Sequence, residues 1–123
     1  METPPLLPFG AAVARDVTAY EELLADNLRL LADRFERDPA YGFIDTKLNL
    51  ITGQDFAAPV PGTIWDRNVI YTWIQGRGLE SLAGHLEWLP RAATLPATAT
   101  RDLGRRLDPM LRRVLARMES LRQ

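Results

Sequence analysis

The sequence has few of the residues that carry metal, thiol or acid–base chemistry. It contains no cysteine and one histidine, His85. The absence of cysteine excludes disulfides, thiolate nucleophiles and cysteine-ligated zinc. One histidine gives no basis for a histidine metal site unless several chains pool their ligands. No stretch approaches the roughly 20 apolar residues of a membrane span. We therefore predict no metal site and no membrane partner.

The chain has little net charge, but its charge is unevenly distributed. The net charge is −1, which gives no overall bias toward nucleic acid or acidic lipid. Residues 1–60 hold 5 basic and 10 acidic side chains, whereas residues 61–123 hold 10 basic and 6 acidic ones. The first residues lack the basic stretch of a secretory signal, and prolines interrupt their apolar part. We therefore expect a cytoplasmic protein.

The first half of the chain predicts one amphipathic helix. At 123 residues the chain is a single domain, and its Pro-rich residues 1–15 predict an extended N-terminal segment. Thr18 and Glu21 fit a capping box, in which both side chains satisfy free backbone donors at a helix start. Apolar residues then recur at helical spacing as far as about Arg37: Tyr20, Leu23, Leu24, Leu28, Leu31 and Phe35. Asp38-Pro39 ends this helix.

The second half predicts two more helices after a short non-helical segment. Residues 41–62 mix apolar residues with turn formers, which indicates a short β-hairpin or an irregular segment. A helix should run over 66–89, with Asp66 as its cap. Residues 100–122 carry a helical leucine stripe with Pro109 inside, which fits either a kinked helix or two short ones. The predicted fold is all-α, made of helical hairpins with one short β-hairpin.

The helix over 66–89 has two apolar sides. One side gathers Tyr71, Leu79, Leu82, Leu86 and Leu89, and Gln75 points the same way. The opposite side carries Trp73, Arg77 and Trp88. Indole faces and a guanidinium suit a sugar, which has C–H groups on one ring face and hydroxyls at its rim. We therefore predict Arg77, Trp73 and Trp88 as substrate-binding residues. The alternative is that the tryptophans belong to the core and Arg77 pairs with a carboxylate.

Glycines 76, 78 and 84 also interrupt this helix. Each costs on the order of 1 kcal/mol of helix stability relative to alanine. Such a cost is expected where a backbone or a ligand must come close. A neighbouring helix would serve as well as a ligand, so both interpretations remain open.

These residues resemble a known family of sugar enzymes. The stretch "DRNVIYTWIQGRGLESLAGHLEWL", preceded by "YGFIDTKLNLITG", resembles the N-terminal part of the N-acylglucosamine 2-epimerase superfamily, which includes cellobiose 2-epimerases and aldose–ketose isomerases. The resemblance covers about residues 17–90. It implies the first part of an (α/α)6 barrel, a sugar substrate and no cofactor. The aromatic-x-Gln-x-Arg pattern falls on Trp73-Ile74-Gln75-Gly76-Arg77, which implies that Arg77 reaches the sugar oxygens and Trp73 forms a pocket wall.

The chain departs from that family in its length and its histidines. Family members are several times longer, and their acid–base histidines come from later helices. Here His85 lies more than a quarter turn from the Trp73–Arg77 side, so we expect it to be packed or half-exposed and not a catalytic base. The catalytic residues are therefore unknown. The chain is expected to be a fragment or a small descendant of such a barrel, which a homo-oligomer or a completing chain would finish.

Two other functions compete with the sugar enzyme. A non-enzymatic interaction module could oligomerise through an exposed apolar helix face. A nucleic-acid binder could use the seven arginines that lie between positions 101 and 122. Asp102, Asp108 and Glu119 interrupt that basic face, however, so we favour a solvated helix face in that place.

Overall fold

The computed structural model describes residues 9–57 and 59–122. Most of them lie in three helices: α1 (Phe9–Arg37), α2 (Thr72–Trp88) and α3 (Ala97–Ser120). The shorter elements are η1 (Pro39–Tyr41), β1 (Leu48–Asn49), β2 (Gln54–Asp55) and η2 (Leu89–Arg91). The strands pair antiparallel, with Leu48 opposite Asp55. The predicted helical fold with one short β-hairpin is confirmed.

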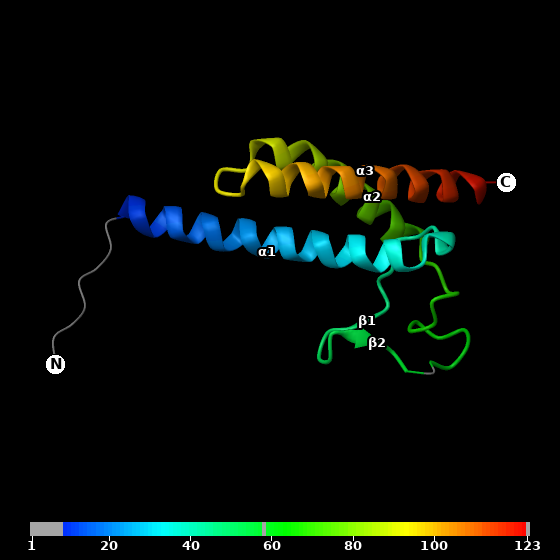
Figure 1. Cartoon of the computed structure of the whole chain (residues 1–123). Coiled ribbons are helices and arrows are strands. Elements are labelled where there is room, and N and C mark those ends of the chain that lie inside the picture. Colours follow the sequence, from blue (N-terminus) through cyan, green and yellow to red (C-terminus); the bar gives the residue numbers. More distant parts are fainter. Residues whose placement is uncertain (1–8, 58, 123) are drawn as a thin grey trace, which may run out of the picture.

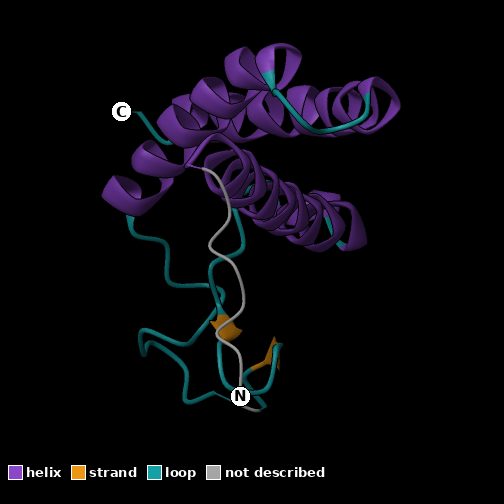
Figure 2. Ribbon diagram, turned by 90° about the vertical axis from the view of Figure 1, so that its left-hand side faces the viewer, coloured by secondary structure: helices purple, strands orange, loops and turns teal. Residues whose placement is uncertain are grey.

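The helices lie lengthwise together, and the hairpin projects from them on one side (Figures 1 and 2). We call residues 42–71, between η1 and α2, the excursion. Helix α3 packs against both α1 and α2. Its side chains Leu103, Leu107, Met110 and Val114 are fully buried at the centre of the core. In α2, Leu82 is buried and Leu79 and Leu86 pack on the same core, so the predicted leucine side of this helix is confirmed.

The extended N-terminal segment is wrong over residues 9–15, which are helical, and residues 1–8 lie outside the described part. The last proline of that segment is Pro8, and the alanine-rich stretch after it favours a helix. Thr18 therefore lies inside α1, where its hydroxyl donates to the Ala14 carbonyl at 3.0 Å. The capping box is also wrong. The Glu21 carboxylate instead accepts hydrogen bonds from the backbone N–H groups of Ala93 and Thr94, before α3.

The buried face of α1 differs from the predicted stripe. Leu28 and Phe35 are buried as expected, but they share that face with Ala25 and Ala32. Tyr20, by contrast, is 69% exposed. The small alanines let α3 approach closely. The face of α1 that packs in the core is therefore not the face that carries all of its largest apolar side chains. The bulky residues predicted the period of the helix correctly and its buried face only in part.

Two helix boundaries also differ from prediction. Helix α2 begins at Thr72 and not at residue 66. Its N-cap position is Tyr71, and Asp66 does not cap it. The Asp66 carboxylate accepts hydrogen bonds from the backbone N–H groups of Gly62 and Asn68, which holds a turn before the helix and lowers the pKa of this carboxyl. Helix α3 begins at Ala97, before the predicted residue 100, and it continues through Pro109 as a single helix.

Candidate functional site

One hollow near the predicted motif lies between the excursion and the start of α2. It has a volume of about 480 Å³. Four aromatic side chains line it together with aliphatic and polar ones: Phe56, Trp65, Tyr71, Trp73, Thr46, Lys47, Leu48, Ile64 and Ile74. We call this hollow the aromatic pocket. Its volume and its mostly apolar lining are typical of small-molecule sites.

A buried carboxylate fixes the excursion to the helices. The Asp45 side chain is 1% exposed. It lies 3.1 Å from the Arg34 guanidinium of α1 and 3.0 Å from that of Arg67. Its Oδ1 also accepts a hydrogen bond from the Lys47 backbone N–H at 3.1 Å. Asp45 thus ties both ends of the excursion to α1 and sets the backbone direction at the edge of the aromatic pocket.

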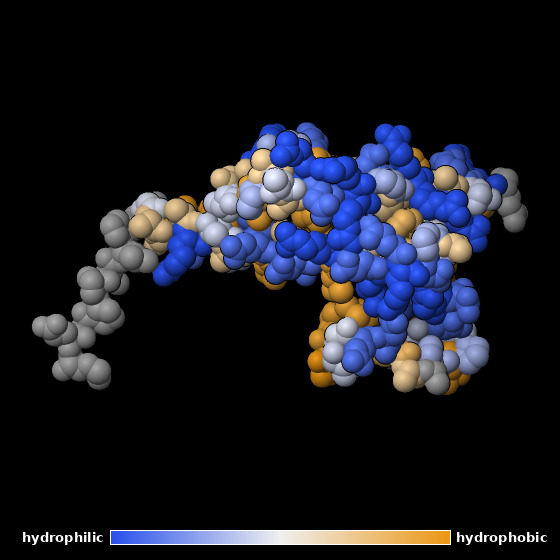
Figure 3. Space-filling view, in the orientation of Figure 1, coloured by the Kyte–Doolittle hydropathy of each residue, from blue (hydrophilic) through white to orange (hydrophobic). Residues whose placement is uncertain are grey.

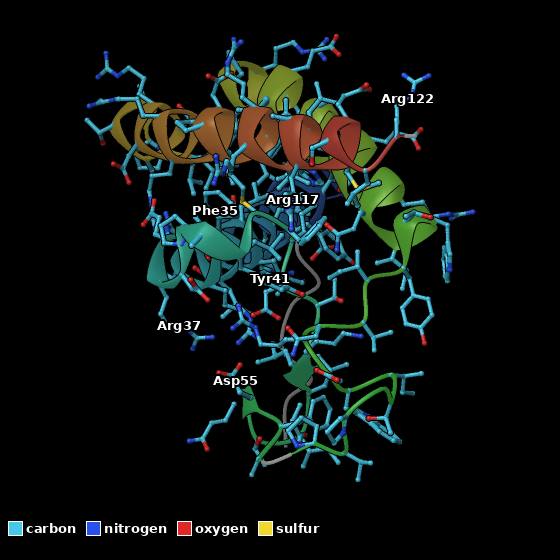
Figure 4. All side chains as sticks on the ribbon, turned by 90° about the vertical axis from the view of Figure 1, so that its right-hand side faces the viewer. Phe35, Arg37, Tyr41, Asp55, Arg117 and Arg122 are labelled. Carbon is cyan, nitrogen blue, oxygen red and sulfur yellow. The ribbon has the colours of Figure 1, made fainter. Side chains whose placement is uncertain are left out.

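A second carboxylate holds the hairpin itself. Asp55 in β2 lies 2.7 Å from the Arg34 guanidinium and 3.0 Å from that of Arg37. Figure 4 shows Asp55 and Arg37 on the same side of the molecule, where the hairpin approaches the end of α1. The hydrogen bond from Arg34 lowers the pKa of Asp55, so this carboxyl stays ionised at neutral pH.

Helix α2 is hydrogen-bonded to the start of the excursion through Gln75. The Gln75 amide accepts a hydrogen bond from the Ile44 backbone N–H at 2.8 Å and donates one to the Ile44 carbonyl at 2.9 Å. At Gly78 an added Cβ would lie 2.4 Å from Ile44 Cδ1. Gly78 is therefore the glycine of α2 that another group approaches closely, and the approaching group is the end of the Ile44 side chain. At Gly76 and Gly84 an added Cβ would meet no described atom within 4 Å.

The polar groups of the aromatic pocket are largely engaged with the protein. The Lys47 ammonium donates to the Ile64 carbonyl and lies 5.1 Å from the centroid of the Tyr71 ring. Phe56 and Trp65 pack edge to face, with centroids 6.2 Å apart. The lining drawn from the described residues includes no carboxylate and no histidine. It therefore offers flat apolar faces for binding, and its titratable side chains are those of Lys47 and Tyr71.

The three predicted binding residues do not share one pocket. Trp73 lines the aromatic pocket and is 64% exposed. Trp88 is half-buried against the helical core and lines a separate hollow with Gly84 and His85. Arg77 is exposed on α2, and in the described part of the chain it lines neither the aromatic pocket nor the hollow beside Trp88. Trp73 and Arg77 are therefore exposed on α2, whereas Trp88 packs against the core.

His85 occupies the position that we expected for a non-catalytic residue. It is half-exposed, and its Nδ1 lies 2.7 Å from the Ser81 carbonyl oxygen. Its ring packs edge to face on Trp88, with centroids 6.2 Å apart. The imidazole is thus used in local packing on α2.

Sequence reasoning missed most of the aromatic pocket. Phe56, Trp65 and Lys47 come from the excursion, where the pattern predicted only a hairpin or an irregular segment. One signal was present, because residues 56–65 carry two aromatic side chains and no charge. An uncharged aromatic loop beside an aromatic helix start is a reason to expect a shared apolar surface.

Comparison with known proteins adds no family to this description. No protein-family model, curated protein or solved structure matches the chain. Among the described residues, no helix combines the length and the apolar character needed to cross a bilayer. The same part of the chain has no cluster of three or more histidine, aspartate or glutamate side chains suited to a metal ion.

Proposed function

We propose that this chain binds a carbohydrate in the aromatic pocket. The observation that supports this proposal is the convergence of Phe56, Trp65, Tyr71 and Trp73 on one hollow of about 480 Å³. The exposed indole faces of Trp65 and Trp73 can stack on the apolar face of a sugar ring. The hydroxyl groups of Thr46 and Tyr71 belong to the same lining and can meet sugar hydroxyls.

The wider form of this proposal is that the chain is the opening portion of a sugar epimerase- or isomerase-like (α/α)6 barrel. The order of helix, hairpin and motif helix supports it. In that form Arg77 binds a sugar oxygen and Trp88 is a second wall. Because both lie outside the aromatic pocket, further residues from a completing chain would have to enclose them. The chain alone would bind sugar without turning it over, since the described pocket lining contains no histidine of the kind that the resemblance implies as the acid–base residue.

Sugar titrations followed by tryptophan fluorescence and by amide NMR test the proposal. Glucose, mannose, N-acetylglucosamine and cellobiose are the probes. We expect Trp73→Ala and Trp65→Ala each to weaken binding by about tenfold, equivalent to about 1.4 kcal/mol of lost contact. Tyr20→Ala is the matched control, because Tyr20 is an equally exposed aromatic residue on α1 outside the pocket. Failure of all four sugars to bind would refute the proposal.

The variant Arg77→Gln separates the two forms of the proposal. If the aromatic pocket alone binds the sugar, this change leaves the affinity within about twofold. If the Arg77 side of α2 is the site, affinity falls while Trp65→Ala has no effect. The second result would move the site from the excursion to the outer face of α2.

A second candidate function is self-association. Large apolar side chains are exposed on α1 and at the hairpin tip, where Leu50 is 89% and Ile51 96% exposed. The space-filling view shows hydrophobic surface on the projecting hairpin region (Figure 3). Exposed apolar surface of this kind favours association. Light scattering over a range of protein concentrations tests it. A constant monomer mass would exclude it, and Ile51→Ser should reduce any dimer.

A further inference from the structure

A separate hollow, with a polar lining, lies where the end of α3 passes over η1. Its volume is about 330 Å³. Five described residues line it: Ala40, Arg113, Ala116, Arg117 and Ser120. None of them also lines the aromatic pocket. Two guanidinium groups border it, one helical turn apart, and the small side chains of the two alanines leave the space between them.

Arg117 is held in place by contacts of its alkyl chain and of the face of its guanidinium group. Its alkyl chain crosses Gly42, where an added Cβ would lie 3.4 Å from Arg117 Cγ. Gly42 has φ +72°, a left-handed conformation that favours glycine. The Arg117 guanidinium carbon lies 5.1 Å from the centroid of the Phe43 ring. Figure 4 shows Arg117 directed from α3 toward the turn that carries Tyr41. A stacked guanidinium keeps its N–H groups available at its edge.

The described residues provide neither Arg113 nor Arg117 with an ion-pair partner. The nearby carboxylates are engaged with other arginines: Asp38 with Arg67, Asp108 with Arg112, and Glu119 with Arg122. Arg106, farther toward the start of α3, is by contrast neutralised by two acids, Asp33 and Glu36. The hollow therefore has two positive charges that the described part of the protein leaves uncompensated.

We propose that this hollow, the anion pocket, binds a small phosphorylated molecule through its phosphate group. Guanidinium groups match the geometry of phosphate oxygens with paired N–H donors. The Ser120 hydroxyl donates to the Arg117 carbonyl at 2.6 Å, so the donors for the ligand come from the two arginines. A hollow of about 330 Å³ holds one phosphate with a small attached group. Nucleic acid would instead use the basic face along the whole of α3, including Arg101 and Arg105.

Titration with inorganic phosphate, followed by NMR of the arginine Nε–Hε groups, tests the proposal. We expect the signals of Arg113 and Arg117 to shift in a saturable way. The variant with Arg113→Gln and Arg117→Gln should lose at least about tenfold in affinity. The matched control is Arg101→Gln with Arg105→Gln, which removes the same charge at the same spacing from exposed positions of α3. The control should bind phosphate within about twofold of the parent chain.

Three results would overturn the proposal. Equal losses in the two double variants would show general accumulation of anions around a basic helix. Tighter binding of an RNA oligonucleotide, dependent on Arg101 and Arg105, would assign the face to nucleic acid. No saturable shift in the parent chain would leave Arg117 the purely structural role of stabilising the end of α3. The single variant Arg113→Gln keeps the test valid if loss of the Arg117 contact with Phe43 unfolds the chain, because it leaves that contact in place.

Discussion

The helical part and the excursion are held together by different forces. In the helices, fully buried side chains such as Leu107 and Met110 pack on one apolar core. The excursion contributes Ile44 to that core, and beyond it the chain is fixed by carboxylates and arginines. Apolar packing depends little on charge state, whereas ionic contacts respond to pH and to single charge changes. The two regions should therefore fail under different perturbations, and the aromatic pocket depends on the region held by charge.

The largest effect should come from truncating the helical core. Leu107→Ala removes a fully buried side chain at the centre of α3. We expect the free energy of unfolding to fall by about 3–5 kcal/mol, through lost burial and the cavity left behind. Chemical denaturation measures it. Leu115→Ala is the matched control, because Leu115 lies on the same helix and is 49% exposed. Similar losses in both variants would contradict the position of the core.

Removing the buried carboxylate of the excursion should have a smaller and more local effect. Asp45→Asn leaves Arg34 with Asp55 and Arg67 with Asp38. We therefore expect a loss of about 2–3 kcal/mol, below the roughly 3–5 kcal/mol typical of breaking a buried pair. Hydrogen exchange should increase in the excursion and stay slow in α3. Uniform acceleration along the chain would show that the two regions unfold together.

Acid should weaken the contacts made by carboxylates, including the hydrogen bonds that join Glu21 of α1 to the loop before α3. The Thr94 hydroxyl, with the backbone N–H groups of Ala93 and Thr94, lowers the pKa of Glu21 below its ordinary value of 4.5. The stabilisation from this carboxylate is thus complete above pH 4.5 and is lost as the pH falls through the lowered pKa. Glu21→Gln should cost about 1–2 kcal/mol at pH 7 and flatten the acid limb of the stability curve. Denaturation at several pH values measures both effects, and an unchanged acid limb would contradict the assignment.

The smallest expected effect on stability is the difference between alanine substitutions at two glycines of α2. Gly84→Ala should stabilise the chain by roughly 0.5–1 kcal/mol, because an added Cβ meets no described atom within 4 Å. Gly78→Ala should lack this gain, because its Cβ would meet Ile44 Cδ1 at 2.4 Å. Ile44→Val removes that methyl group, so the pair with Gly78→Ala should be less destabilised than the sum of the single changes. Thermal unfolding of the four variants measures the coupling, and strict additivity would exclude the contact.

The sequence predicted the helices better than their surroundings. Helical spacing identified the three helices and the leucine side of α2, because apolar periodicity is a local property. It misplaced the start of α1 and the buried face of that helix, since Ala25 and Ala32 are too small to mark a face. The Gln75 contact with Ile44 joins residues 31 positions apart, which no local pattern reveals.

The candidate site shows the same division. The sequence by itself determined that Trp73 and Arg77 lie on the same side of a helix, because both positions follow from its 3.6-residue turn. Only the tertiary structure decided that Trp73 lines the same hollow as Phe56 and Trp65 while Arg77 does not, and that Arg113 and Arg117 border a hollow beside Ala40. The physical reason is that helix geometry is fixed by neighbours in the chain. The path of the excursion is fixed by the charges of Asp45 and Asp55, which both pair with Arg34 of α1.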